Sequence, residues 1–232
     1  LAAQESDKLE FMKDLWFAQA GLYKGLPLDD RTAVEALTTP RPQPTEPRDQ
    51  YVYYPDTSPV PEAVAVDTRG RSFNIAAYVK VDHPEAGGVL FAFGSRFGGQ
   101  TLYVKDGRLC YVYNWLNEKE QKLVSDTPVP AGECVLGVRF RMEGTENGIP
   151  KGTAALYIND RKTAEAGIIT QPGKFGLGSG LAVGRDPGQA ITHDYTAPFP
   201  FNGGVIHKVV ADVSGEPYRN MEKELVAMMS HD

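Results

Sequence analysis

Apolar and polar residues alternate between Gly87 and Trp115, and this alternation predicts three consecutive short β-strands. Successive side chains of a strand point to opposite faces of a sheet, so a period of two indicates strands with one buried face. Asp106 and Gly107 stand between two alternating runs. Asp-Gly in that position is a strong local signal for a hairpin turn. We therefore expect a β-hairpin around these two residues.

The alternating pattern extends over most of the chain. Strands are predicted at residues 73–81, 88–94, 101–105, 108–115, 121–125, 133–141, 153–159, 162–166, 181–184 and 204–213. Turns are expected at Asn159-Asp160 and in the glycine-containing segment 143–152. About ten short strands separated by turn residues favour an all-β fold over residues 63–213, a two-sheet antiparallel β-sandwich or jelly roll.

Helices are predicted at both ends of the chain. Over residues 7–24, apolar side chains recur at helical spacing and predict a helix with one buried face, which Gly25 and Pro27 end. These side chains are Leu9, Met12, Leu15, Trp16, Ala20 and Tyr23. At the other end, Ser214 as a cap and Pro217 in the first turn predict a helix over residues 214–232. We expect that helix to pack on the sandwich, on a neighbouring domain or at a subunit contact.

A proline-rich connector, residues 38–62, links the first helix to the sandwich. Its seven prolines favour an extended backbone that runs over a surface. Tyr51, Tyr53 and Tyr54 within it predict that part of the connector docks as an edge strand.

Composition and charge narrow the class of partner. Of the 232 residues, 41% are hydrophobic and 23% are charged, which suits a globular chain with a core. No apolar run reaches the roughly 18–20 residues that cross a bilayer, so we expect no membrane partner. The formal net charge of −6, without a basic stripe, argues against nucleic acid as a partner. Residues 1–7 have neither an initiator Met nor the pattern of a signal peptide, which indicates an internal cut and leaves the compartment open.

The two cysteines, Cys110 and Cys134, fall in separate predicted strands. A single disulfide between them is one interpretation. Buried free thiols are the favoured one, because a chain of this size does not depend on one crosslink.

A series of short motifs runs in order through nearly the whole chain. They occupy residues 26–31, 53–55, 71–72, 94–99, 104–107, 113–115, 183–186, 194–195 and 198–201. Together they resemble the C-terminal region of bacterial arylsulfatases, members of the formylglycine-dependent sulfatase family. The resemblance implies a concanavalin- or laminin-G-like β-sandwich, with residues 1–37 forming the end of the sulfatase core.

The catalytic signature of that family is absent from this sequence. The formylglycine residue arises from the first residue of Cys-x-Pro-x-Arg or Ser-x-Pro-x-Arg, and neither Cys110 nor Cys134 begins such a motif. The resemblance therefore implies no catalytic residue, cofactor or metal site in this chain. It places the nucleophile upstream, together with the calcium ion of the parent enzyme. The implied partner is the sulfatase catalytic domain on the same polypeptide, and a homo-oligomer stays open.

The richest polar cluster in the sequence combines Arg185 and Asp186 with His193, Asp194 and Tyr195. A sandwich rim with these groups could bind a sugar or a calcium ion, since calcium prefers oxygen ligands. The alternative, which we favour from the sequence, is a loop pinned by Arg–Asp pairing and tyrosine hydrogen bonds.

Two further loops carry candidate residues. Arg96 precedes Phe97 and a Gly-Gly pair, and it could contact a catalytic domain or belong to a plain tight turn. Asp29 and Asp30 could be read as a metal-binding pair. We favour helix capping or pairing with Arg31, because no apolar strand precedes them.

Aromatic and acidic pairs suggest other classes of site. Tyr111, Tyr113 and Trp115 share one face of a strand, and sandwich core is favoured over a platform for sugar rings. Glu118 and Glu120 have the spacing of a glycosidase acid pair, but they lie in a polar segment predicted to be a turn, so we expect no hydrolase site there.

The sequence therefore favours a non-catalytic C-terminal domain of an arylsulfatase-like sulfuric ester hydrolase. Such a domain would support the catalytic domain, the rim of its cleft or oligomer contacts. The alternative is an autonomous carbohydrate-binding, lectin-like module, and a free-standing glycanase is the third hypothesis.

Overall fold

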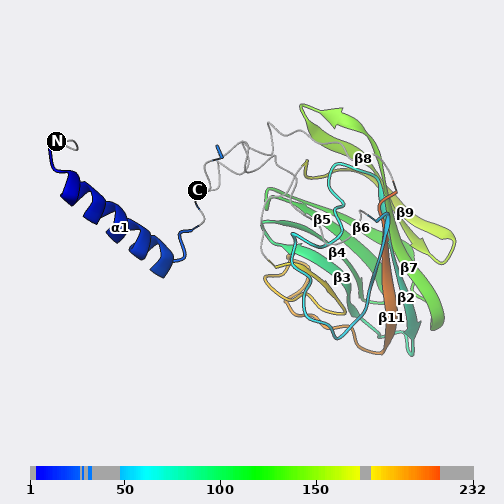
Figure 1. Cartoon of the computed structure of the whole chain (residues 1–232). Helices are drawn as coiled ribbons and strands as arrows, with labels where there is room; N and C mark the ends of the chain where they lie inside the picture. The colour runs from blue at the N-terminus through cyan, green and yellow to red at the C-terminus, as the bar shows by residue number, and fades with distance from the viewer. Residues whose placement is uncertain (1–3, 27, 29–30, 33–47, 173–178, 215–232) are drawn as a thin grey trace. The chain divides into compact units, whose positions relative to one another are not determined.

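The computed structural model describes residues 4–26, 28, 31–32, 48–172 and 179–214 (Figure 1). The chain divides into two units, Leu1–Pro42 and Gln43–Asp232. The first contains helix α1 (Ser6–Leu22), and the second contains all the strands. In the part of the chain that the structure describes, no helix has the length and apolar character needed to span a membrane.

The predicted N-terminal helix is confirmed, but its predicted buried face is not. No residue of α1 is buried, and Met12 and Trp16 of the expected apolar stripe are exposed. Phe11, Phe17 and Leu22 are also exposed. They fall outside that stripe, so apolar side chains are spread around the helix instead of forming one face.

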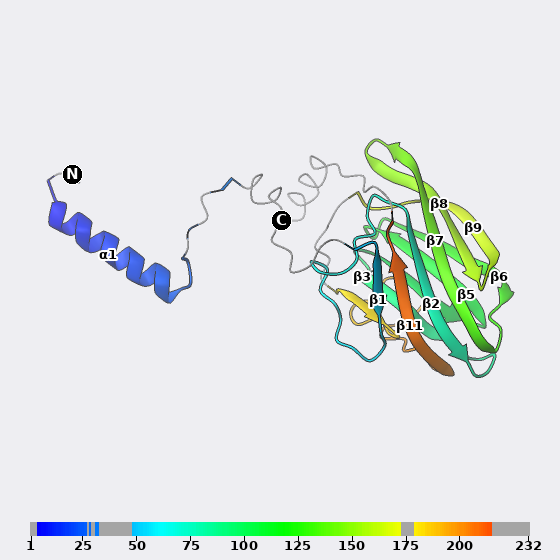
Figure 2. The ribbon, with the colours of Figure 1, turned by 45° about the vertical axis from the view of Figure 1, so that its right-hand side comes forward.

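The second unit is a β-sandwich of two antiparallel sheets, as predicted, and its two layers are seen in Figure 2. The six-stranded sheet has the order β1 (Gln50–Tyr53), β11 (Gly204–Asp212), β2 (Phe73–Val81), β7 (Gly132–Glu146), β8 (Ile149–Ile158) and β9 (Arg161–Ile169). The five-stranded sheet has the order β10 (Leu181–Val183), β3 (Gly88–Ser95), β4 (Gly98–Lys105), β5 (Arg108–Trp115) and β6 (Lys119–Pro128).

The main apolar core lies between the two sheets, where the inward-facing residues of each strand meet. Phe73 of β2 and Phe140 of β7 pack there with ring centroids 5.3 Å apart. From the opposite sheet, Tyr111 and Tyr113 are fully or almost fully buried, and Trp115 packs against the same core. The three aromatic residues of β5 are therefore core, as favoured from the sequence, and form no sugar platform.

Residues with positive backbone φ angles mark the positions of the tight turns. Asp106 and Gly107 have φ values of 51° and 70° between β4 and β5, which confirms the predicted hairpin. The prediction of a long turn over residues 143–152 is wrong. Asn147 and Gly148, with φ values of 50° and 74°, make a two-residue turn instead, so β7 and β8 extend almost to each other.

Part of the connector docks on the sandwich as predicted. β1 pairs with β11 as an edge strand, and the Tyr53 hydroxyl accepts a hydrogen bond of 2.9 Å from the Val66 amide. The predicted C-terminal helix lies outside the described residues apart from Ser214, and Asp29 and Asp30 lie outside them as well.

Both cysteines are free and buried. Cys134 belongs to the core between the sheets, whereas Cys110 belongs to a second apolar cluster on the other face of the five-stranded sheet. The two thiols therefore lie on different sheets, with the five-stranded sheet between them, which explains why no disulfide joins them.

Candidate functional site

One long loop, residues 184–203, covers the outer face of the five-stranded sheet. Strand residues that alternate with the core residues form a second apolar cluster there: Val89, Ala92, Tyr103, Cys110 and Val112. Ile191 of the loop completes this cluster, and Tyr195 and Phe199 pack against it. The loop is thus fixed to the sheet by its own small apolar core.

Glycine lets the loop approach β3 closely. Gly88 has a φ of 119°, and a Cβ atom on it would lie 2.3 Å from the carbonyl oxygen of Pro200. Bridges between Gly87 and Asn202 and between Val89 and Pro200 join the loop to the strand here. A side chain at position 88 would push the end of the loop off the sheet.

A buried carboxylate holds the middle of the loop. Asp186 accepts hydrogen bonds from the Ile191 amide at 3.1 Å, from the Gly188 amide at 3.4 Å and from the Tyr195 hydroxyl at 2.8 Å. Burial raises the pKa of Asp186, and these hydrogen bonds offset only part of the effect. Tyr195 also contacts the Thr101 hydroxyl on β4 at 3.1 Å. Asp186 and Tyr195 therefore have the loop-pinning role that the sequence favoured.

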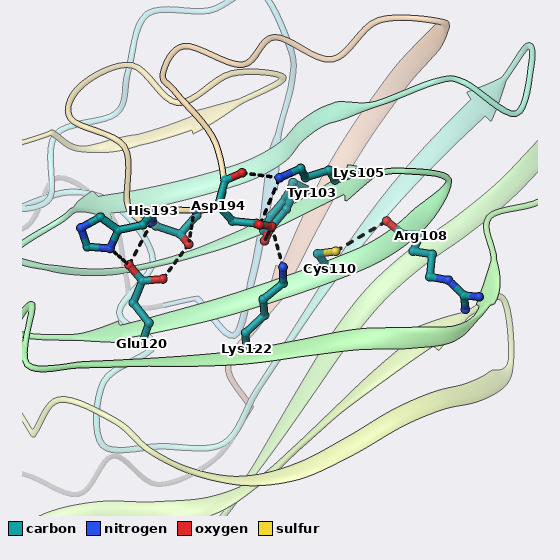
Figure 3. Close-up of polar contacts among 9 residues, drawn as sticks. Tyr103, Lys105, Arg108, Cys110, Glu120, Lys122, His193 and Asp194 are labelled. Carbon is teal, nitrogen blue, oxygen red and sulfur yellow. Dashed lines mark hydrogen bonds and ion pairs between the residues drawn. The ribbon is translucent and has the colours of Figure 1, made fainter.

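A second carboxylate, Asp194, lies at the surface and receives three donors from the sheet (Figure 3). Lys122 Nζ is 2.7 Å and Lys105 Nζ is 3.1 Å from its two carboxylate oxygens, and the Tyr103 hydroxyl donates at 2.5 Å. Lys105 also donates to the backbone oxygen of Asp194 at 2.5 Å. We call these four residues the Asp194 clamp.

The clamp shifts the acidity of its members in opposite directions. Partial burial raises the pKa of Asp194, but the hydrogen bonds from Lys122, Tyr103 and Lys105 outweigh it and lower that pKa to about 2. Burial, followed by the hydrogen bond to Asp194, raises the pKa of the Tyr103 phenol. Asp194 is thus a stable carboxylate and Tyr103 a neutral donor at ordinary pH.

Glu120 of β6 binds the neighbouring part of the loop. Its carboxylate accepts from the Thr192 hydroxyl at 2.8 Å and from the His193 amide at 3.0 Å, and it lies 2.5 Å from His193 Nδ1. The His193 side chain is 76% exposed, so its ring is presented to solvent beside the clamp.

The expectation that Glu120 lies in a turn is wrong. Leu116 and Asn117, with φ values of 54° and 60°, make the turn, and β6 begins at Lys119. The side-chain oxygen of Asn114 accepts a hydrogen bond from the Asn117 amide and fixes the turn before Lys119. Glu120 therefore lies on β6.

The structure brings together four of the six candidate residues from the sequence. Asp186, His193, Asp194 and Tyr195 lie on the loop described above, whereas the side chains of Arg185 and Arg96 engage other groups. Arg185 donates to the Thr57 carbonyl at 3.1 Å instead of pairing with Asp186. Arg96 lies between β3 and β4 with its guanidinium 5.5 Å from the Phe97 ring centroid.

Three residues of the site were not identified from the sequence: Tyr103, Lys105 and Lys122. Glu120 was considered only as half of a glycosidase pair and was set aside. Tyr103 and Lys105 on β4, like Glu120 and Lys122 on β6, are spaced two apart and point away from the core. Polar residues at outward-facing positions were the available signal, but such positions are polar on most sheets.

The chemistry of the site favours binding of a polar or anionic group over binding of a cation. Two ammonium groups already occupy the carboxylate of Asp194, and they would repel a calcium ion. Within the described residues, no group of three or more His, Cys, Asp or Glu residues could hold a metal ion.

Comparisons with known proteins find similarity only at the level of solved structures. No protein-family model matches the chain, and no curated protein matches it. The CBM40 of the Ruminococcus gnavus IT-sialidase, solved with α2,3-sialyllactose, is 15% identical, with 69% of this chain and 84% of that chain covered and a TM-score of 0.44.

Two other solved structures are similar to a comparable degree. Domains LG4-5 of the mouse laminin α1 chain are 12% identical, with 75% of this chain and 41% of that chain covered and a TM-score of 0.43. A putative carbohydrate-binding protein from Bacteroides ovatus is 16% identical, with 77% and 43% covered and a TM-score of 0.41. The assignment of a β-sandwich rests on the strand pairing of the chain itself.

Proposed function

We propose that this chain is a non-catalytic carbohydrate-binding module whose binding surface is the Asp194 clamp together with Glu120 and His193. The observation that carries the proposal is the convergence of charged donors and acceptors at one place on a rigid sheet. Lys105 and Lys122 come from β4 and β6, and Asp194 comes from the loop that crosses above them.

These groups have the exposure that a binding surface needs. The side chains of Lys105 and Lys122 are 34% and 38% exposed, so each ammonium group is anchored and still reaches solvent. Sugar hydroxyls both donate and accept hydrogen bonds, and bonds to charged partners are stronger than bonds between neutral groups. Because Asp194 already orders both lysine side chains, little conformational entropy is lost when a ligand binds.

The same geometry opposes the glycanase hypothesis. A glycosidase needs one carboxyl group that stays protonated to act as the general acid. The clamp instead lowers the pKa of Asp194 to about 2, which keeps it ionised. Glu120, the other carboxylate of the proposed binding surface, already accepts hydrogen bonds from Thr192 and His193.

One observation favours a second role, as an accessory domain of a larger enzyme such as the arylsulfatase-like parent suggested by the sequence. Helix α1 exposes large apolar side chains, among them Phe11, Met12 and Phe17. A helix with apolar residues on several sides is typical of a segment that packs inside another domain. The two roles are compatible, since a binding module can be attached to a catalytic domain.

A glycan array tests the binding proposal. We expect the wild-type chain to bind at least one class of oligosaccharide, and Lys122→Met, which keeps the aliphatic stem, to lose that binding. Lys162→Met is the matched control, because Lys162 is an exposed lysine that pairs with Glu165 on β9 in the other sheet. An array without any bound glycan, or equal loss in both variants, would overturn the proposal.

A further inference from the structure

We propose that the Asp194 carboxylate occupies the position of an anionic group of the ligand, so that the module takes acidic saccharides bearing a carboxylate or a sulfate. This inference rests on the proposed function and narrows it to one ligand class. In this arrangement the Asp194 carboxylate competes with the anionic group of the ligand for Lys105 and Lys122.

The number and placement of donors around Asp194 support this assignment. Lys122, Lys105 and Tyr103 approach its two carboxylate oxygens from β4 and β6, at 2.7, 3.1 and 2.5 Å (Figure 3). All three donors belong to the sheet, and only the acceptor belongs to the loop. The sheet therefore presents a preformed receptor for one planar or tetrahedral anion.

The charge balance of the clamp favours either binding of a second anion or replacement of the Asp194 carboxylate by an anionic group of the ligand. Two ammonium groups face one carboxylate, so the clamp carries a surplus positive charge. Another carboxylate of the site, that of Glu120, is directed to Thr192 and His193. A carboxylate or sulfate of the ligand would pair with the ammonium groups of Lys105 and Lys122, which now pair with Asp194.

The loop does not depend on the Asp194 carboxylate for its position. Lys105 also binds the backbone oxygen of Asp194, and the His193 amide donates to Glu120. On the other side, Tyr195 bonds Asp186 and Thr101. The side chain of Asp194 can therefore rotate away while the loop remains on the sheet.

A ligand can also reach the ion pairs of the clamp. The Asp194 side chain is 21% exposed and its partners Lys105 and Lys122 are 34% and 38% exposed, so both ammonium groups are open to solvent on one side. A ligand that brings its own anion, together with hydroxyl contacts to His193 and Glu120, can replace the Asp194 side chain.

Calorimetric titration of wild type, Asp194→Asn and Asp160→Asn tests the inference. Asp160 lies exposed in the β8–β9 turn, so its variant removes the same charge away from the clamp. The probes are oligosaccharides of one neutral backbone and its uronate-containing and sulfated forms, which separates the two sources of negative charge.

We expect Asp194→Asn to bind the uronate or the sulfated form about five- to tenfold more tightly than wild type, since the competing carboxylate is gone. Binding should weaken as salt increases. Adding Lys122→Met to Asp194→Asn should weaken it at least about tenfold. Asp160→Asn should match wild type.

Two results would overturn the inference. If Asp194→Asn binds the neutral backbone as well as it binds the charged forms, the ligand is a neutral saccharide, and the proposed function survives without this refinement. If neither wild type nor Asp194→Asn binds any glycan, the refinement and the proposed function both fail. Thermal unfolding of each variant establishes that a loss of binding is not a loss of folding.

Discussion

At the scale of single residues, the two aspartates of the loop have opposite roles because their surroundings differ. Asp186 is buried and neutral partners bind it, so burial raises its pKa. Asp194 is near the surface, and cations bind it, so its pKa is lowered to about 2. The first holds the loop in place, and the second faces the surface where we place the ligand.

The lowered pKa of Asp194 predicts a specific pH dependence. A carboxyl group whose pKa falls on folding stabilises the native state above its unfolded pKa of about 4, and this contribution disappears as the pH falls through about 2. The difference in unfolding free energy between wild type and Asp194→Asn should therefore shrink between pH 5 and pH 2. Urea unfolding at a series of pH values measures it. A constant difference would show that the clamp does not form.

Removal of one hydroxyl should loosen the loop. Tyr195→Phe leaves the buried Asp186 carboxylate with one donor fewer and removes the contact with Thr101, at an expected cost of about 1–3 kcal/mol. Tyr78→Phe, on the outer face of the six-stranded sheet, is the control and should change stability by less than about 0.5 kcal/mol. Equal effects of the two variants in denaturant unfolding would contradict the pinning role of Tyr195.

The sequence identified the half of the site that is contiguous along the chain and missed the half that is not. Asp186, His193, Asp194 and Tyr195 are neighbours on one loop, and their residue types mark them. Lys105 and Lys122 meet Asp194 across 89 and 72 residues. Their meeting depends on which strands lie side by side, and alternation within a strand carries no information about that order.

At the scale of elements, the period of two located the strands well, because each buries one face against the core. β2 and β5 have the predicted bounds. The bounds of turns were predicted less accurately where glycines are frequent, as the prediction over residues 143–152 shows. The deciding signal there was the Asn147-Gly148 pair, whose residues adopt positive φ easily.

Close packing of the loop on β3 predicts an unequal effect of two glycine substitutions. Gly88→Ala introduces both an unfavourable φ and a clash with Pro200, whereas Gly132→Ala, at a φ of 98°, introduces the unfavourable φ with no atom within 4 Å. We expect about 1–3 kcal/mol for Gly132→Ala and a larger loss for Gly88→Ala. Thermal or urea unfolding compares them. A Gly88→Ala variant no less stable than Gly132→Ala would mean that the loop does not lie against β3.

At the scale of the whole molecule, the sandwich has an apolar core built from its own strands and loops. Among the residues that the structure describes, those buried in the second unit run from Ala65 to Val213.

Removal of residues 1–42 should therefore leave the sandwich intact. We expect the unfolding midpoint to shift by less than about 2 °C, which corresponds to about 0.5–1 kcal/mol for a domain of this size. Calorimetry of the two chains measures the shift. A drop of many degrees would show that the first unit stabilises the sandwich.

The account of function depends on one claim, that the sandwich binds carbohydrate at the Asp194 clamp. Backbone amide shift mapping by NMR during titration with an array-selected glycan tests this claim most directly. The largest changes should occur at residues 103–105, 120–122 and 192–195, with the outer face of the six-stranded sheet unaffected. Changes centred on that other face, or none at saturating glycan, would contradict the account.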